Sequence, residues 1–178
     1  LLASTGLRLS EARHLERRDV DLAHGVLTIR MSKFRKSRLV PLHPTSVQAL
    51  TRYAARRDAC PGVPRSEFFF RTDQAPSLDR FAVERTFSRM RHHLGWTSHG
   101  RARRPHIHDL RHTFAVRRLL RWYEEGVDLD RKILALATYL GHARVSHTYW
   151  YLSAVPELMA ITAQRFEQFA RRERESAP

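Results

Sequence analysis

The last third of this chain holds histidines, an arginine and a tyrosine whose types and spacing suit chemistry at a phosphate. On a helix, His108, Arg111 and His112 would share one face, because residues three and four apart are neighbours there. Tyr151 follows within an aromatic run, and Arg8 near the start of the chain is a further candidate cation. These side chains indicate a pocket in which several cations bind one phosphate while a tyrosine attacks it.

Tyr151 needs help to act as a nucleophile. A tyrosine hydroxyl is protonated by roughly a thousand to one at neutral pH, because its reference pKa is near 10. Cations or a base must therefore lie beside it, and His142, nine residues earlier, is a candidate. Tyr149 competes with it as a nucleophile by spacing, and ordinary packing of the aromatic run 149–151 is the alternative without chemistry.

A zinc site is the alternative function of the histidine pair. His108 and His112 have the spacing of zinc ligands on a helix, but the residues between them lack the glutamate of the metalloprotease motif. Arg111, which lies within this span, adds electrostatic cost to any bound cation. The single cysteine, Cys60, excludes an intrachain disulfide and a multi-cysteine zinc site. We therefore expect no metal.

The charge of the chain points to a polyanionic partner. The formal net charge is +14 and the pI is about 11.3, which favours nucleic acid over the alternative of a solvated basic surface. Of 32 basic residues only three are lysines, and arginine suits phosphate because its planar fork binds two oxygens. Neither a membrane-spanning stretch nor a signal peptide is visible, so the cytoplasm is the expected location. The first residue is not methionine, so we expect that an N-terminal portion is missing.

Periodicity and turn residues predict a mainly α-helical domain with one small antiparallel β-sheet, an α+β fold over residues 1–178. The two main strands are expected at residues 26–30 and 38–42, joined by a polar hairpin tip at 32–37. Pro41 would place the second strand at an edge. Further predictions are a turn at 19–21, a short buried strand at 68–70, and helices at 10–15, 44–57, 108–125, 129–140 and 156–173.

Two more helices are predicted from their caps. A cap at Ser77 or Asp79 would begin a helix that ends near Leu94, and Ser146 would cap a short one that holds Tyr149 and Tyr151. The first of these carries an apolar stripe that we expect to face the core, formed by Phe81, Phe87, Met90 and Leu94.

Four spans taken together resemble the tyrosine recombinase (phage integrase) family. They are TGLRLSE at residues 5–11, HDLRHTFA at 108–115, LGH at 140–142, and Tyr151. Their order, spacing and neighbours match that family's catalytic domain over almost the whole chain. The resemblance implies the fold of that catalytic domain, and it implies an N-terminal core-binding domain that this chain lacks.

In the first half of the chain the resemblance implies roles for four residues. Arg8 would be the first catalytic arginine, and Glu11 its acidic supporter. Lys33 would be the hairpin lysine that protonates the departing 5′ oxygen of the DNA, with Lys36 as the fallback.

In the last third the resemblance implies the remaining catalytic roles. His108 and Arg111 would be the paired His-x-x-Arg, with His112 beside them in support. His108 would accept the tyrosine proton, His142 would donate to the transition state, and Tyr151 would be the nucleophile. Arg8 and Arg111 would each donate two hydrogen bonds to the non-bridging phosphate oxygens.

The implied reaction cuts and rejoins double-stranded DNA through a 3′-phosphotyrosine link. Such a link conserves the bond energy, so the resemblance implies no ATP, metal or other cofactor. The alternatives are a type IB topoisomerase-like relaxation and a non-catalytic DNA-binding module. Residues predicted to contact DNA, chiefly at backbone phosphates, are Arg35, Lys36, Arg101, Arg103, Arg104 and Arg144.

The resemblance also implies an assembly and a location. The expected assembly is a homotetramer on DNA, or a monomer for this piece alone, with no membrane partner. Residues 156–175 would dock on a neighbouring protomer, and packing on their own domain is the alternative. The expected location is the bacterial cytoplasm, in association with the nucleoid.

Overall fold

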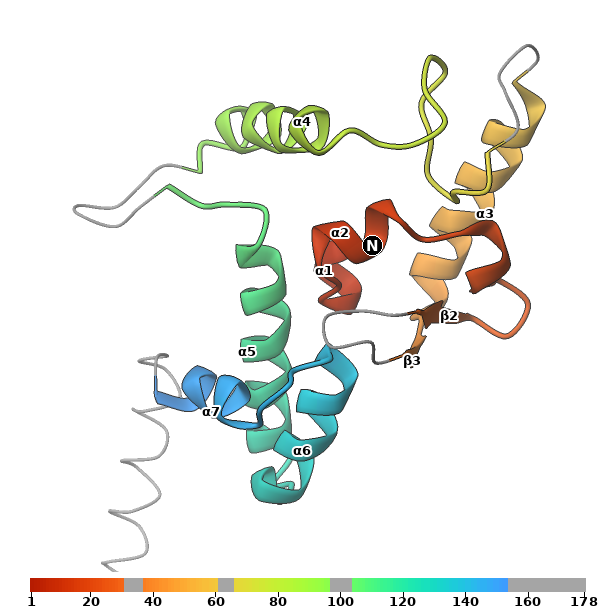
Figure 1. Cartoon of the computed structure of the whole chain (residues 1–178). Helices are drawn as coiled ribbons and strands as arrows, with labels where there is room; N and C mark the ends of the chain where they lie inside the picture. The colour runs from red at the N-terminus through yellow and green to blue at the C-terminus, as the bar shows by residue number, and fades with distance from the viewer. Residues whose placement is uncertain (31–36, 61–65, 97–103, 154–178) are drawn as a thin grey trace, which may run out of the picture. The chain divides into compact units, whose positions relative to one another are not determined.

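The computed structural model describes residues 1–30, 37–60, 66–96 and 104–153 (Figure 1). The chain divides into two compact units. The first unit comprises Leu1–Phe114 and Tyr139–Gly141, and the second comprises Ala115–Thr138 and His142–Pro178. The predicted fold class is confirmed, because the described residues form helices and one small antiparallel sheet. None of the described helices is both long and apolar enough to cross a bilayer.

A three-stranded sheet lies in the first unit, in the order β1-β2-β3. Its strands are β1 (Val20–Asp21), β2 (Val26–Ile29) and β3 (Arg38–Pro41), and both pairs are antiparallel. The two predicted strands are confirmed within a residue, and Pro41 lies on an edge strand as expected. The predicted turn at 19–21 is wrong, because Val20 pairs with Leu27. A strand of two residues is too short to show alternation in sequence.

The core of the first unit forms where the sheet meets the nearby helices. Residues of β2 alternate between partial and full burial, and Leu27 and Ile29 are the buried pair. The helices of this region are α1 (Leu2–Thr5), α2 (Leu9–Arg13) and α3 (Pro44–Ala59), and a 3-10 turn, η1, spans Arg17–Asp19. Helix α3 starts where predicted, because proline is favoured in the first turn. The core cluster consists of Leu7, Leu15, Leu27, Ile29, Val40, Leu50 and Phe69.

Helix α4 (Arg80–His93) begins at the predicted cap but does not bury the predicted stripe. The carboxylate of Asp79 accepts a hydrogen bond from the backbone N–H of Ala82 at 2.7 Å. No residue of α4 is buried, and Phe81 and Met90 are 73% and 55% exposed. Met90 lines an open apolar groove of about 520 Å³ in the first unit. The stripe was therefore correctly seen as apolar and wrongly assigned to the core.

The predicted strand at residues 68–70 is also wrong. Phe68 makes one isolated bridge with Glu16, and no ladder follows. The burial part of the prediction holds for Phe69, whose ring is 3% exposed and packs against Tyr53. Aromatic contacts rather than strand pairing hold this segment in place.

Helices α5 (Asp109–Glu124) and α6 (Leu129–Leu140) begin in one unit and continue into the other. Both match their predictions within two residues, and α7 (Ser146–Ser153) starts at the predicted cap residue itself. Within the second unit, the buried residues of α5 and α6 recur at helical spacing. They are Ala115, Leu119, Tyr123, Ile133, Leu136 and Ala137. The helix predicted at 156–173 lies outside the described residues.

Candidate functional site

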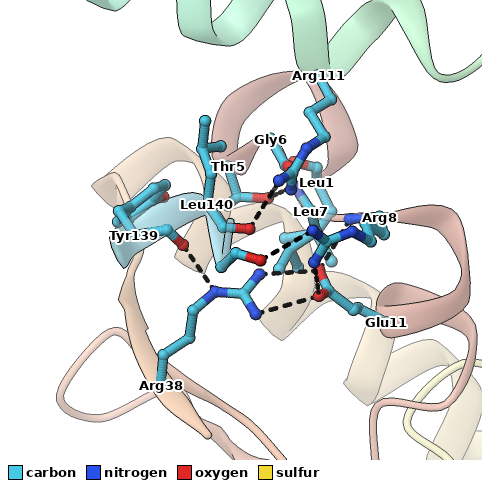
Figure 2. Close-up of polar contacts among 11 residues, drawn as sticks. Leu1, Thr5, Gly6, Leu7, Arg8, Glu11, Arg38, Arg111, Tyr139 and Leu140 are labelled. Carbon is cyan, nitrogen blue, oxygen red and sulfur yellow. Dashed lines mark hydrogen bonds and ion pairs between the residues drawn. The ribbon is translucent and has the colours of Figure 1, made fainter. Parts of the chain in front are cut away.

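Arg8 stands at the start of α2 and is held by Glu11, one turn later. The Glu11 carboxylate accepts from the backbone N–H of Arg8 at 2.9 Å and from its Nη1 at 2.8 Å (Figure 2). Nη2 of Arg8 donates to the carbonyl oxygen of Gly141 at 2.9 Å. The side chain of Arg8 remains 22% exposed. Among the described residues these bonds engage two of its five N–H donors, so others remain for a bound anion.

Glu11 is shared with a second arginine, Arg38, at the start of β3. Nη1 and Nη2 of Arg38 lie 3.1 and 2.9 Å from the two carboxylate oxygens, and the two side chains are only 8% and 6% exposed (Figure 2). Burial by itself would raise the pKa of Glu11, but hydrogen bonds from Arg38 and Arg8 hold the pKa below its usual value. The carboxylate therefore stays ionised between two cations.

Arg111 is buried, with 3% of its surface exposed, and it reaches two backbone carbonyls. Nη1 donates to Gly6 at 2.6 Å and Nη2 donates to Leu140 at 2.7 Å (Figure 2). Gly6 has a φ of +63°, and a Cβ built there would lie 2.6 Å from the ring of Phe114. Glycine, which has no Cβ, lets the backbone at residue 6 lie close to the Phe114 ring in this conformation, with its carbonyl accepting from Arg111.

Three arginines thus meet the C-terminal end of α6. Arg38 donates to the carbonyl of Tyr139 at 2.7 Å, and Arg111 and Arg8 donate to the next two carbonyls along the chain. The last carbonyls of a helix lack intrahelical partners and carry the negative end of the helix dipole. Guanidinium groups satisfy both features, so the end of α6 and Glu11 together bind three arginines of the first unit.

His108 lies just before α5, beside His112. The two rings meet edge to face with centroids 4.9 Å apart. Partial burial of the ring, followed by the charges of His112 and Arg111, lowers the pKa of His108. The imidazole is therefore neutral at physiological pH and can accept a proton.

Tyr151 lies in the second unit, against His142. The two rings are stacked at a centroid distance of 6.1 Å, and Tyr151 is only 3% exposed. Nδ1 of His142 is 2.7 Å from the hydroxyl of Thr148, which is completely buried. The competing candidate, Tyr149, is 45% exposed. The phase of α7 thus separates the two tyrosines and places the buried one next to the histidine.

The predicted site residues fall into three groups. The first unit brings Arg8, Glu11 and Arg111 together around the end of α6, and it places His108 and His112 side by side. The second unit brings His142 and Tyr151 together. Two predicted DNA contacts, Arg104 in the first unit and Arg144 in the second, are exposed. The predicted residues that lie outside the described ranges are Lys33, Arg35, Lys36, Arg101 and Arg103.

Sequence reasoning missed Arg38 and Thr148. Arg38 reads as one of many arginines, and its partner Glu11 lies 27 residues away in the chain. Thr148 lies six residues after His142, a spacing that identifies no contact across a turn. A buried pairing of an arginine with a carboxylate leaves no local pattern, so no signal in the sequence would have found it.

A model of the phage integrase family matches residues 1–157. A Sinorhizobium fredii protein named as an integrase/recombinase, y4rE, is 44% identical over 165 residues, which are 93% of this chain and 52% of that protein. The chain therefore spans about half the length of this relative.

Two solved structures resemble the chain. The crystal structure of XerA recombinase has a TM-score of 0.73 and 27% identity, over 93% of this chain and 54% of that one. The XerH site-specific recombinase bound to its difH substrate has a TM-score of 0.64 and 24% identity, over 84% of this chain and 40% of that one, and supports the fold alone. These neighbours do not favour the topoisomerase alternative. The match of the family model over residues 1–157 shows that the chain belongs to the phage integrase family.

Proposed function

We propose that this chain is the catalytic part of a site-specific DNA recombinase or integrase, with Tyr151 as its nucleophile. The observation that carries the proposal is the buried stack of Tyr151 on His142, in a chain that belongs to the phage integrase family. An imidazole beside the attacking hydroxyl can donate a hydrogen bond to the charge that develops on the phosphate. The exposure of Tyr149 supports the choice between the two tyrosines.

In the proposed reaction the phenolic oxygen of Tyr151 attacks a DNA phosphorus, and the bond from phosphorus to the 5′ oxygen breaks. His108 accepts the tyrosine proton, and its lowered pKa supports this role. Lys33 supplies the proton that the departing 5′ oxygen takes up. The product is a 3′-phosphotyrosine link, and attack by a 5′ hydroxyl reverses the step and rejoins a strand.

Arg8 and Arg111 stabilise the charge that develops on the non-bridging oxygens, and His142 adds a donor. Planar guanidinium groups can each offer two parallel N–H bonds to a phosphate. The anchoring of Arg8 by Glu11 and the backbone supports this role, because pre-oriented donors need no reorganisation when the charge appears. The arginines take the part that metal ions play in other phosphoryl transfers, so we propose a reaction independent of metal and ATP. Cleavage that persists in excess EDTA tests this.

Double-stranded DNA is the proposed partner. The net charge of +14 supports binding to phosphate backbones, and the exposed Arg104 and Arg144 are candidates for such contacts. The structural neighbour XerH is bound to a DNA substrate. We further propose a homotetramer on DNA in the bacterial cytoplasm, in which residues 156–175 dock on the next protomer and a separate core-binding domain completes the grip on DNA.

The test is covalent trapping on a nicked suicide substrate, with the full-length protein that contains this chain. Wild type and the control variant Tyr149→Phe should both form a protein–DNA adduct that survives denaturant. Tyr151→Phe should form none, because it lacks the attacking oxygen. An undiminished adduct with Tyr151→Phe would show that the nucleophile is wrongly assigned, and no adduct from wild type would favour a non-catalytic DNA-binding module.

A further inference from the structure

We propose that Arg38 is a positioning residue of the cleavage site, which keeps the positive charge of Arg8 available to the scissile phosphate. The inference rests on the proposed function, since it concerns how Arg8 meets the phosphate. Arg38 itself does not touch the DNA in this scheme. It acts through Glu11 and through the backbone that Arg8 binds.

The first support is the geometry of the shared carboxylate. Arg38 binds both oxygens of Glu11 with bonds of 3.1 and 2.9 Å, while Arg8 takes one of the same oxygens through Nη1 at 2.8 Å (Figure 2). Two-point binding fixes the plane of the carboxylate, because a guanidinium and a carboxylate match as two parallel forks. The direction in which Glu11 holds Arg8 therefore depends on Arg38.

The second support is the balance of charge. Arg38 and Glu11 are almost completely buried, whereas Arg8 is partly exposed. Two guanidinium groups and one carboxylate leave one net positive charge, and the exposed member of the group is the one that can present it. Without Arg38, Glu11 would neutralise Arg8 alone, and the field at the phosphate would fall.

The third support is the contact of Arg38 with the backbone at the end of α6. Its Nε donates to Tyr139, and its Nη1 would lie 2.8 Å from a Cβ placed on Gly141. The guanidinium thus lies close to the glycine whose carbonyl accepts from Arg8. A side chain at that glycine would displace Arg38. Both groups that bind the Arg8 side chain, the Glu11 carboxylate and the Gly141 carbonyl, therefore lie against Arg38.

The test compares the rate of adduct formation in a single turnover on the suicide substrate, together with DNA affinity. Arg38→Met should lower the rate about tenfold or more. Removing a donor that contacts the transition state costs about a hundredfold in rate, and the effect of Arg38 is smaller because it acts through Glu11 on Arg8. DNA affinity should change by less than about twofold, because one phosphate contact in many is weakened and none is removed. Arg38→Lys, which keeps the charge without the two-point bond, should recover part of the rate.

The decisive variant is the double substitution Arg38→Met with Glu11→Gln. If Arg38 acts by offsetting the carboxylate charge, removing that charge should recover the rate several-fold over Arg38→Met alone. A merely structural role predicts a double variant no faster than the single one. The matched control is Arg57→Met, which removes another buried arginine of the first unit, bonded to Asp58 and to the carbonyl of Phe69. It should destabilise the fold and leave the rate per folded molecule unchanged.

The outcomes separate the inference from the proposed function. An adduct from wild type with an equal rate for folded Arg38→Met overturns the role of Arg38 and leaves the recombinase proposal intact. If Arg38→Met does not fold, the test uses Arg38→Lys alone, and a wild-type rate for folded Arg38→Lys overturns the requirement for two-point binding. No adduct from wild type overturns both proposals.

Discussion

Replacing Gly6 by alanine should destabilise the first unit more than its backbone conformation alone requires. The φ of +63° costs an L-residue about 1–2 kcal/mol. The new methyl group would also lie 2.6 Å from Phe114 and 3.0 Å from Leu140, closer than carbon atoms pack. Such overpacking costs about 1–3 kcal/mol. Alanine also restricts the unfolded chain, which offsets about 0.4–1 kcal/mol of this loss. The expected net loss of stability is therefore about 1–5 kcal/mol.

Gly95→Ala is the matched control. This glycine belongs to the same unit and has nearly the same φ, +65°, but apart from its own chain neighbours no heavy atom of the described residues lies within 4 Å of a Cβ placed there. Gly95→Ala should therefore lower the free energy of unfolding only by the cost of the positive φ, about 1 kcal/mol. The difference between the two variants isolates the contact of Gly6 with Phe114 and Leu140.

Equilibrium unfolding in urea, followed by far-ultraviolet circular dichroism, measures both variants. The transition midpoint of Gly6→Ala should lie below that of Gly95→Ala at an equal slope, because a change in midpoint alone reports stability. Equal midpoints would refute the close approach at Gly6. Since the Gly6 carbonyl accepts from Arg111, Gly6→Ala should also slow DNA cleavage beyond what the unfolded fraction explains.

Three further predictions follow from single contacts. Thr148→Val should slow adduct formation and Thr148→Ser should largely keep it, because only a hydroxyl can hold Nδ1 of His142; equal rates for the two variants would contradict this. The lowered pKa of His108 means that the unfolded chain binds its proton more readily, so the free energy of unfolding should fall as the pH drops below about 6.5 and level off below the folded pKa. The matched test is His108→Gln, which should flatten this slope in urea titrations at several pH values. Asp79→Ala should lower the stability by about 1 kcal/mol in the same assay by removing the cap of α4, whereas Asp79→Asn should keep most of that stability because its side-chain oxygen can also accept the bond; an equal loss in the two variants would show that this capping bond is not the cause.

Local order was predictable where the determining contacts are close in sequence. Glu11 lies three residues from Arg8, so a capping interaction across one turn was within reach of sequence reasoning. The helices with strong periodicity, α5 and α6, also match their predictions. The roles assigned to site residues remain predictions, which the trapping experiments test.

The failures have a common physical cause. Phe81 and Met90 form an apolar stripe that the structure leaves exposed, because periodicity shows that a face is apolar and not what covers it. Val20 belongs to a strand because Leu27 pairs with it, and no property of the short segment itself determines this pairing.

The sequence by itself determined the chemistry that is available: the excess of arginine, the histidines, the tyrosine and their order along the chain. Only the tertiary structure decided which of these groups meet. It placed Arg38 with Glu11, gathered three arginines on the carbonyls at the end of α6, and buried Tyr151 against His142 while leaving Tyr149 exposed. Charged and polar groups are stabilised in a protein interior only by specific partners, and folding brings those partners together from distant parts of the chain.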